Sequence, residues 1–269
     1  MAIFAVTNQK GGVGKTTTAV NLSAALSAMR YHVLLVDLDP QCNATVGSGV
    51  IVDKAAGSLS EVLLGQASIQ SAIQSTNYGY HILPSNHRLT AAEVGLVGKK
   101  DKEKHLKNLL AKVKKIYHYI IIDCPPTLNI LTINALVAAN EVIIPVQCEY
   151  YALEGLAKLL KTIDALRQTL RVGLEIHGVL RTMYDGRNLL TRQVSERLMQ
   201  SFPDKVYQTV IPRNIRLAEA PSHGMPILSY DKRSQGAASY LAFAAEMIRR
   251  SRSSQDKMIP MIEGEEKHA

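Results

Sequence analysis

The chain has 269 residues, 46% of them hydrophobic and 20% charged, which is enough for one large core, so we expect a single domain rather than two small ones. Its 31 Lys and Arg residues exceed its 23 Asp and Glu residues and leave a formal net charge of +8, which suits a polyanionic partner such as nucleic acid or an acidic membrane surface. The cysteines show no C-x-x-C spacing, which argues against a structural zinc, an iron–sulfur cluster or a disulfide scaffold, and we expect Cys42, Cys124 and Cys148 to be small buried hydrophobes.

The N-terminal residues lack the features of an export signal. No basic flank is followed by a long apolar segment and a small-residue cleavage site. No later stretch reaches about 18 uninterrupted apolar residues, the length that a membrane-spanning helix needs. We therefore expect a soluble, cytoplasmic protein in a reducing compartment, without membrane binding.

Short apolar runs of strand length recur along the chain, and most are separated by segments with helical spacing. They cover residues 3–6, 33–36, 81–83, 120–122, 142–146, 176–180 and 206–211. Continuous β-branched runs such as 120–122 are typical of parallel strands covered by helices on both faces. The pattern predicts an α/β fold with a doubly wound, mostly parallel sheet flanked by helices. We expect residues 1–250 to form this domain and residues 251–269, which lose apolar periodicity, to form a largely disordered tail.

The first apolar run leads into a glycine-rich segment, K-G-G-V-G-K-T, at residues 10–16. The ordinary phosphate loop G-x-x-x-x-G-K-[ST] would need glycine where Gln9 stands, so the segment fits the deviant form with an extra lysine, Lys10. Its glycines let backbone N–H groups approach phosphate oxygens at a helix N-terminus. Lys15 is expected to contact the β- and γ-phosphates, and the Thr16 hydroxyl to ligate Mg²⁺. The predicted ATP-binding residues of the loop are Lys10, Gly11, Gly12, Val13, Gly14, Lys15, Thr16 and Thr17.

Acidic residues follow two later runs, where ligands bind in sheets of this class. Asp37 and Asp39 come after residues 33–36, and their period-2 spacing places both carboxyl groups on one side of the strand end. Either could orient a water molecule. Asp123 comes after residues 120–122, where phosphate-loop proteins hold Mg²⁺ through an aspartate. Thr16, Asp39 and Asp123 are therefore the candidate magnesium residues.

With these motifs the chain closely resembles the ParA/Soj family of partition ATPases, over about residues 2 to 250. The resemblance rests on the segments at residues 8–18, 37–41 and 123–126, and on I-P-R-N-I-R-L-A-E-A-P-S-H-G at residues 211–224, which is the most particular to the family. It implies a homodimer formed on ATP binding, in which Lys10 of one subunit reaches the phosphates of the other. It also implies that Asp39 positions the attacking water and that Asp123 belongs to a magnesium-sensing switch. The expected catalytic residues are Lys10, Lys15 and Asp39.

The resemblance also suggests adenine and DNA contacts. Asn214 and Pro212 match the family's adenine-binding segment, and Arg187 and Arg216 match basic residues that bind DNA without sequence preference. The lysine-rich stretch at residues 99–115 looks like the polar side of a helix, with a further DNA or partner contact as the alternative. No segment precedes the first strand where larger plasmid partition proteins carry a helix-turn-helix domain, so operator-specific binding is not expected.

The expected function is that of a cytoplasmic, nucleoid-associated ATPase with slow basal turnover, using ATP and Mg²⁺ and reset by a ParB-type centromere-binding protein. Its output would be chromosome or plasmid partition, and the sequence does not distinguish these cargoes. One alternative is a MinD-like membrane ATPase that places the division site, which would need an amphipathic C-terminal helix; residues 241–248 instead have the pattern of a helix that closes the domain. Another is an ATP-locked DNA clamp or regulator with negligible turnover. An electron-transfer ATPase would need paired cysteines, and Cys124 has no suitable mate.

Overall fold

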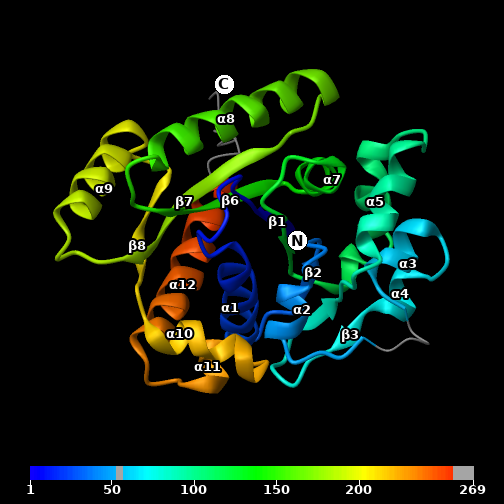
Figure 1. Cartoon of the computed structure of the whole chain (residues 1–269), viewed down its shortest axis with the longest axis horizontal. Helices are drawn as coiled ribbons and strands as arrows, with labels where there is room; N and C mark the ends of the chain where they lie inside the picture. The colour runs from blue at the N-terminus through cyan, green and yellow to red at the C-terminus, as the bar shows by residue number, and fades with distance from the viewer. Residues whose placement is uncertain (53–56, 257–269) are drawn as a thin grey trace, which may run out of the picture.

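The structure is a computed structural model that describes residues 1–52 and 57–256. Within these residues one eight-stranded sheet runs through the molecule (Figure 1). The strands are β1 (Ala2–Val6), β2 (Val33–Asp37), β3 (Gln74–Ser75), β4 (His81–Leu83), β5 (Tyr119–Asp123), β6 (Glu141–Gln147), β7 (Glu175–Tyr184) and β8 (Val206–Pro212). They lie in the order β3-β4-β2-β5-β1-β6-β7-β8; β3 pairs antiparallel with β4, and the other pairs are parallel. The predicted fold class is confirmed.

Helices connect the strands and cover both faces of the sheet. The α-helices are α1 (Lys15–Ala28), α2 (Asn43–Gly47), α3 (Leu59–Leu64), α4 (Ile69–Ala72), α5 (Leu89–Val97), α6 (His105–Leu110), α7 (Ile130–Ala138), α8 (Ala152–Leu170), α9 (Leu189–Ser201), α10 (Ile215–Glu219), α11 (Ile227–Tyr230) and α12 (Gln235–Asp256), and the 3₁₀ turns are η1 (Lys102–Lys104), η2 (Lys114–Ile116) and η3 (Ala220–His223). Figure 1 shows α1 and α12 on one side of the sheet and α7 and α8 on the other. Of the helices in the described part of the chain, none is long and apolar enough to cross a membrane.

Two apolar clusters, one on each face, hold the layers together. Along β1, Ile3 and Ala5 belong to the cluster under α7 and α8, whereas Phe4 and Val6 belong to the cluster under α1 and α12. Because successive side chains of a strand point to opposite faces, a continuous apolar run supplies both clusters at once. This is why the central strands have no polar alternation.

The seven predicted strands are confirmed, most of them within one residue at either end. The main difference is β7, which continues to Tyr184, four residues beyond the predicted end at residue 180. The short strand β3 carries no hydrophobic run, and the sequence did not predict it. Within the described sheet it pairs with β4 alone. It is therefore a strand because of its hydrogen bonds to β4 and not because of its own composition.

The last described helix closes the domain, as the apolar pattern of residues 241–248 predicted. Phe243, Ala244 and Met247 of α12 are fully buried in the cluster that also contains α1. The helix extends to Asp256, so the expected domain boundary at residue 250 falls inside α12. Residues 257–269, where we expect a disordered tail, lie outside the described residues.

The lysine-rich stretch at residues 99–115 is not the single helix that the sequence suggested. It divides into η1, α6 and η2, and Asp101 at the start of η1 has a φ of 53°, in the left-handed region. Its apolar residues Leu106, Leu110 and Val113 are all buried in the core cluster. These three residues have the i, i+4, i+7 spacing of one helix face and pack against the domain, although the stretch is broken into shorter elements.

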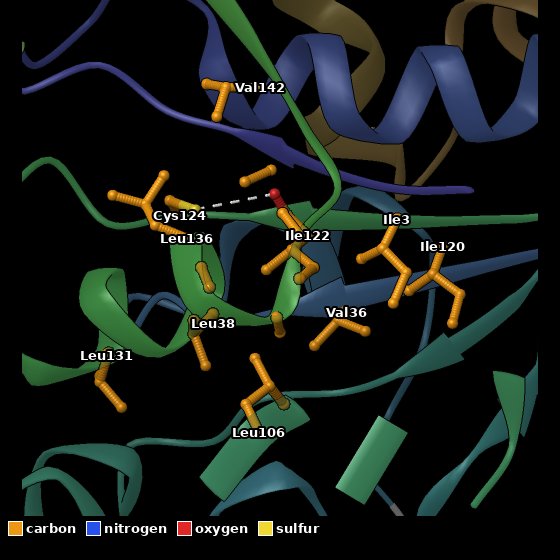
Figure 2. Packing of buried hydrophobic residues seen from close by; sticks show 14 of the residues in the cluster. Ile3, Val36, Leu38, Leu106, Ile120, Ile122, Cys124, Leu131, Leu136 and Val142 are labelled. Carbon is orange, nitrogen blue, oxygen red and sulfur yellow. Dashed lines mark hydrogen bonds between the residues drawn. The ribbon is translucent and has the colours of Figure 1, made fainter. Parts of the chain in front are cut away.

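The cysteines behave largely as predicted. Figure 2 shows Cys124 among the apolar side chains of one core cluster, with its thiol donating to the carbonyl oxygen of Ile122 at 3.8 Å. Cys148 is buried as well, whereas Cys42 is partly exposed. Burial raises the pKa of the Cys148 thiol to about 11, so it is a protonated packing residue at neutral pH.

Candidate functional site

The sheet brings the predicted motifs to one edge. Strand β5 lies between β1 and β2, and its last residue, Asp123, is level with Val6 of β1 and Asp37 of β2. The glycine-rich loop follows β1, and Asp39 follows β2. As predicted for strands whose carboxyl ends point the same way, these segments meet at a common site.

The glycine-rich loop depends on backbone conformations that other residues rarely adopt. Gly12 and Gly14 have φ values of 72° and 85°, and Gly14 immediately precedes the first turn of α1. A side chain at either position would strain the backbone. The hydroxyl of Thr182 donates to the carbonyl oxygen of Val13 at 2.8 Å, which ties the loop to β7. The free N–H groups at the start of α1 are therefore held at the site, where an anion can accept their hydrogen bonds.

A cavity of about 570 Å³ opens above the loop. It is lined by Gly11, Gly12, Gly14, Lys15, Thr16, Thr17, Asp39, Gln41, Asn43, Pro126, Thr182, Met183, Ile211, Pro212, Arg213, Asn214, Leu217, Ala218 and Tyr240. The lining includes most of the loop residues that the sequence selected, but not Lys10 or Val13. Val13 turns its side chain into the core, and the Lys10 ammonium bonds to Glu149 instead.

Lys15 is a buried cation at the base of this cavity. Its side chain is 7% exposed, and its ammonium group donates to the carbonyl oxygen of Lys10 at 3.2 Å. Burial lowers the pKa of Lys15, while Asp123 and Asp39 act in the opposite direction. Because burial leaves this cation poorly solvated, it gains from an anionic ligand that reaches it through the cavity.

The Asp37 carboxyl group takes part in hydrogen bonds that stabilise the fold. One oxygen accepts hydrogen bonds from the backbone N–H and the hydroxyl of Thr45, at 2.8 and 2.6 Å, and the other accepts from the backbone N–H of Asp39 at 3.2 Å. Burial raises the pKa of Asp37 to about 6, although the Thr45 bonds oppose this shift. It does not line the cavity, so it anchors α2 rather than a ligand.

Asp39 and Asp123 remain available for ligand chemistry. Asp39 lines the cavity, and one of its oxygens accepts from the backbone N–H of Gln41 at 2.9 Å. Asp123 is completely buried, and among residues 1–52 and 57–256 neither of its carboxyl oxygens has a hydrogen-bond partner. Burial and the nearby Asp37 raise the pKa of Asp123 well above its usual range, while Thr16 and Lys15 act against this. Of the two aspartates at the end of β2 and just beyond it, Asp39 lines the cavity and Asp37 does not.

The same residues fit a magnesium ion. Thr16 and Asp39 line the cavity, and Asp123, whose oxygens have no partner among the described residues, ends the strand beside β1, which leads into the loop. Mg²⁺ prefers oxygen ligands and is usually held by one or two protein groups together with phosphate oxygens and water. A cation would also supply the partner that the buried Asp123 carboxylate lacks.

The far end of the cavity contains the residues expected at the adenine. Pro212 ends β8, and the Asn214 side chain caps α10 by accepting from the backbone N–H of Leu217 at 3.1 Å. Both residues line the cavity, so their placement is compatible with a base contact. The Asn214 amide nitrogen carries no capping bond and can still donate to a ligand.

Four lining residues were missed by sequence reasoning: Asn43, Thr182, Met183 and Tyr240. Thr182 and Met183 belong to the end of β7, and inspection of that strand end would have found them if its true length had been predicted. Met183 has a φ of 47°, an uncommon conformation for a residue with a side chain. Tyr240 reaches the cavity from α12, where its hydroxyl lies 3.3 Å from that of Thr18, and no local sequence signal marks it.

The two arginines that we associated with DNA lie on the surface. Arg187 is 92% exposed and pairs with Asp185 at 2.8 Å. Arg216 is 55% exposed and pairs with Glu219 at 2.9 Å and with Asp231 at 3.7 Å. Both guanidinium groups can change partners at little cost, because exposed ion pairs are weak.

The chain is similar to curated partition proteins over nearly its whole length. A family model described as an AAA domain matches residues 1–176. The chain is 52% identical over 246 residues to the sporulation initiation inhibitor protein Soj of Bacillus subtilis, covering 91% of this chain and 97% of that protein. It is 47% identical over 249 residues to the chromosome partitioning protein ParA of Myxococcus xanthus, covering 92% and 88%.

Solved structures share the fold. A cobyrinic acid a,c-diamide synthase from Mycobacterium smegmatis, with bound ATP analogue and magnesium, has a TM-score of 0.82 and 38% identity, covering 94% of this chain and 97% of that one. The cell division ATPase MinD of Pyrococcus furiosus has a TM-score of 0.76 and 27% identity, covering 92% and 98%.

Proposed function

Because this chain belongs to the ParA/Soj family of partition ATPases, we propose that it hydrolyses ATP with Mg²⁺ to drive chromosome or plasmid partition. ATP binding produces a homodimer, the dimer binds DNA without sequence preference on the nucleoid, and a ParB-type protein stimulates hydrolysis. Basal turnover is slow, since the protein acts as a timer.

One observation carries the proposal: a buried lysine and a buried, unpaired aspartate flank a glycine loop at the base of a cavity of about 570 Å³. The Lys15 ammonium donates to a backbone carbonyl oxygen and has further N–H donors, and the Asp123 oxygens have no hydrogen-bond partner among the described residues, so both groups can still bind a ligand. Phosphate oxygens match the lysine and the helix N-terminus, and a divalent cation matches the aspartate. A magnesium nucleotide supplies both partners in one ligand.

Different residues of the chain then bind the phosphates, hold the cation and orient the attacking water. Lys15 and the backbone N–H groups after Gly12 hold the phosphates, and the Thr16 hydroxyl and Asp123 carboxylate hold the cation. Asp39 accepts a hydrogen bond from the attacking water and orients it. Bound Mg²⁺ neutralises the charge that develops on the phosphate oxygens. Since phosphoryl transfer requires little covalent chemistry from the protein, positioning and charge neutralisation account for the catalysis.

Lys10 acts across the dimer in this proposal. It lies outside the ordinary phosphate-loop motif and outside the lining of its own cavity, so it has no evident role at its own nucleotide. Its backbone nevertheless faces the site, because its carbonyl oxygen accepts from the Lys15 ammonium. The Lys10 side chain therefore reaches the phosphates bound by a second copy.

The test is ATP-dependent assembly followed by phosphate release. With a slowly hydrolysed ATP analogue and Mg²⁺, light scattering should show a dimer for the wild-type chain and a nucleotide-bound monomer for Lys10→Ala. Phosphate release should be slow alone and faster with duplex DNA and the ParB-type protein of the same genome. A wild-type chain that stays monomeric with the analogue contradicts the proposal. A dimer that binds DNA without any phosphate release supports the ATP-locked clamp, and binding to anionic vesicles in place of DNA supports the membrane ATPase.

A further inference from the structure

The extra lysine of the phosphate loop is bonded to its own subunit. The Lys10 ammonium lies 2.6 Å from a carboxylate oxygen of Glu149, and the two side chains are 38% and 47% exposed. Glu149 follows β6, which pairs with β1, the strand that leads into the phosphate loop. Two neighbouring strand ends therefore place an anion beside the cation that we expect to act on a second copy.

The backbone of Lys10 is held independently of this ion pair. The side chain of Asn8 accepts from the Lys10 backbone N–H at 3.0 Å and donates to the carbonyl oxygen of Pro145 at 2.8 Å. The Lys15 ammonium donates to the Lys10 carbonyl oxygen. Removing the Glu149 carboxylate should thus free the lysine side chain without disturbing the loop.

We infer that Glu149 is a positioning residue that retains Lys10 in its own subunit and must release it before the dimer can form. The inference rests on the proposed role of Lys10 across the dimer. The 2.6 Å contact holds the Lys10 ammonium against the end of β6 in its own subunit, so in this proposal the side chain leaves Glu149 when it extends to the phosphates of another subunit. Each dimer therefore exchanges two Lys10–Glu149 pairs for two contacts between lysine and phosphate.

The free energy of the two released Lys10–Glu149 pairs determines how strongly Glu149→Gln should affect dimerisation. Because exposed ion pairs each change an equilibrium by about 1.4- to 5-fold and a dimer releases two, Glu149→Gln should strengthen dimerisation with a slowly hydrolysed ATP analogue about 2- to 30-fold. The gain should shrink with added salt, since salt screens pairs that are this exposed. ATP affinity of the monomer should not change.

Glu154→Gln is the matched control. Glu154 lies on α8 and pairs with Lys158 at 2.7 Å, with side chains 59% and 67% exposed, and this substitution removes the same charge only five positions away along the chain. It should leave dimerisation unchanged. If both variants strengthen the dimer equally, net charge is responsible and the inference fails.

A second measurement does not require nucleotide or a dimer. Brief acylation of the nucleotide-free protein, read by peptide mass spectrometry, reports how available each lysine ammonium is. Glu149→Gln should accelerate labelling of Lys10 and not of Lys158, and Glu154→Gln should do the reverse. Unchanged labelling of Lys10 in Glu149→Gln overturns the inference, whatever the ATPase assays give.

The two measurements separate the possible failures. Faster labelling with no gain in dimerisation means that Glu149 pairs with Lys10 without controlling assembly, which also overturns the inference. If the Glu149→Gln dimer forms as in the wild type but hydrolyses ATP more slowly, Glu149 contributes to hydrolysis in the dimer rather than retaining Lys10, and the inference fails. If Lys10→Ala dimerises like the wild type, the proposed function of Lys10 fails, and the labelling result still reports whether the pair exists in solution.

Discussion

Asp123, an expected magnesium residue, and Arg216, an expected DNA contact, are both ionisable, but the fold surrounds them in opposite ways. Asp123 is fully buried and neither oxygen accepts a hydrogen bond from the part of the chain that the structure describes, whereas Arg216 is 55% exposed and already pairs with Glu219 and Asp231. The site thus keeps one buried carboxyl group, that of Asp123, without a hydrogen-bond partner among the described residues, whereas the surface keeps solvated charges with exchangeable partners. A ligand should gain much from the first region and little from each residue of the second.

The largest effect that this comparison predicts is on hydrolysis. Asp39→Ala should bind ATP and dimerise but show phosphate release about 100- to 10,000-fold slower, because orienting the attacking water stabilises the transition state more than the bound ground state. The measurement is single-turnover hydrolysis beside light scattering with the ATP analogue. Asp164→Ala, which removes an exposed carboxylate paired with Arg167 on α8, is the control and should behave as wild type. Failure to bind nucleotide would instead make Asp39 a structural or magnesium-holding residue.

Nucleotide affinity should show the next largest effect. Lys15→Ala removes the buried cation at the base of the cavity, and loss of charge-assisted hydrogen bonds in such a place should weaken ATP binding about 100-fold. Equilibrium titration with a fluorescent ATP analogue measures it, with circular dichroism to verify folding. Lys161→Ala, on the exposed side of α8, should bind normally. Equal affinities for all three proteins would remove the phosphate-loop assignment.

The buried acidic cluster should also make stability depend on pH. Burial raises the folded pKa of Asp37 from 3.8 to about 6, so its carboxyl group favours the folded state fully below pH 3.8, and this contribution is lost as pH rises through about 6. Between about pH 4.5 and 6.5 the wild-type chain should lose about 2 kcal/mol of unfolding free energy relative to Asp37→Asn, which cannot ionise there.

Urea unfolding of both proteins at three pH values in this range, without nucleotide, measures the difference. Asp164→Asn, which replaces an exposed carboxylate, controls for surface ionisation and should follow the wild-type curve. A constant free-energy difference between wild type and Asp37→Asn across the range would mean that Asp37 ionises as easily in the folded chain as in the unfolded one. Burial would then have no effect on the pKa of Asp37, and the Asp37 carboxyl group would ionise like an exposed one.

The smallest effect belongs to the surface arginines. Arg216→Glu should weaken binding of the ATP-bound dimer to two unrelated duplexes alike, by about tenfold, and lower the slope of log affinity against log salt by about 0.9 for each phosphate that the protein no longer neutralises. Arg88→Glu is the matched control, because Arg88 is 53% exposed and pairs with Glu61 far from α10 in the chain. ATP affinity must be measured alongside, since Arg216 lies close to Asn214 in the sequence. Preference for one duplex, or an unchanged slope, contradicts the proposed DNA surface.

Much of the site was predictable because its signals are local. The glycine loop, the lysine and threonine that follow it, and the aspartates after two apolar runs lie within a few residues of their strands. Parallel strands bring their carboxyl ends together, so predicting the strands was enough to predict which segments meet. The roles of Lys10, the adenine residues and the DNA arginines came from family resemblance and stay predictions.

Other features depended on residues far apart in the chain. Asp37 ends β2 and Asp39 follows it two residues later, and the sequence does not distinguish them. The bonds from Thr45 show that Asp37 is used by the fold, whereas Asp39 lines the cavity. Tyr240 enters the cavity from the last helix, and nothing in its neighbouring sequence indicates this.

The sequence by itself therefore determined the fold class, the phosphate loop and the acidic strand ends, since backbone preference and hydrophobic alternation act between near neighbours. Only the tertiary structure decided which charges are buried, which are paired and which remain unsatisfied. The Lys10–Glu149 pair joins residues 139 positions apart, and the buried state of Asp123 depends on strands from across the first half of the chain. The burial of a charged group and the identity of its bonding partner depend on how distant segments pack together. A local sequence pattern therefore does not predict the pKa shifts and charge interactions of this site.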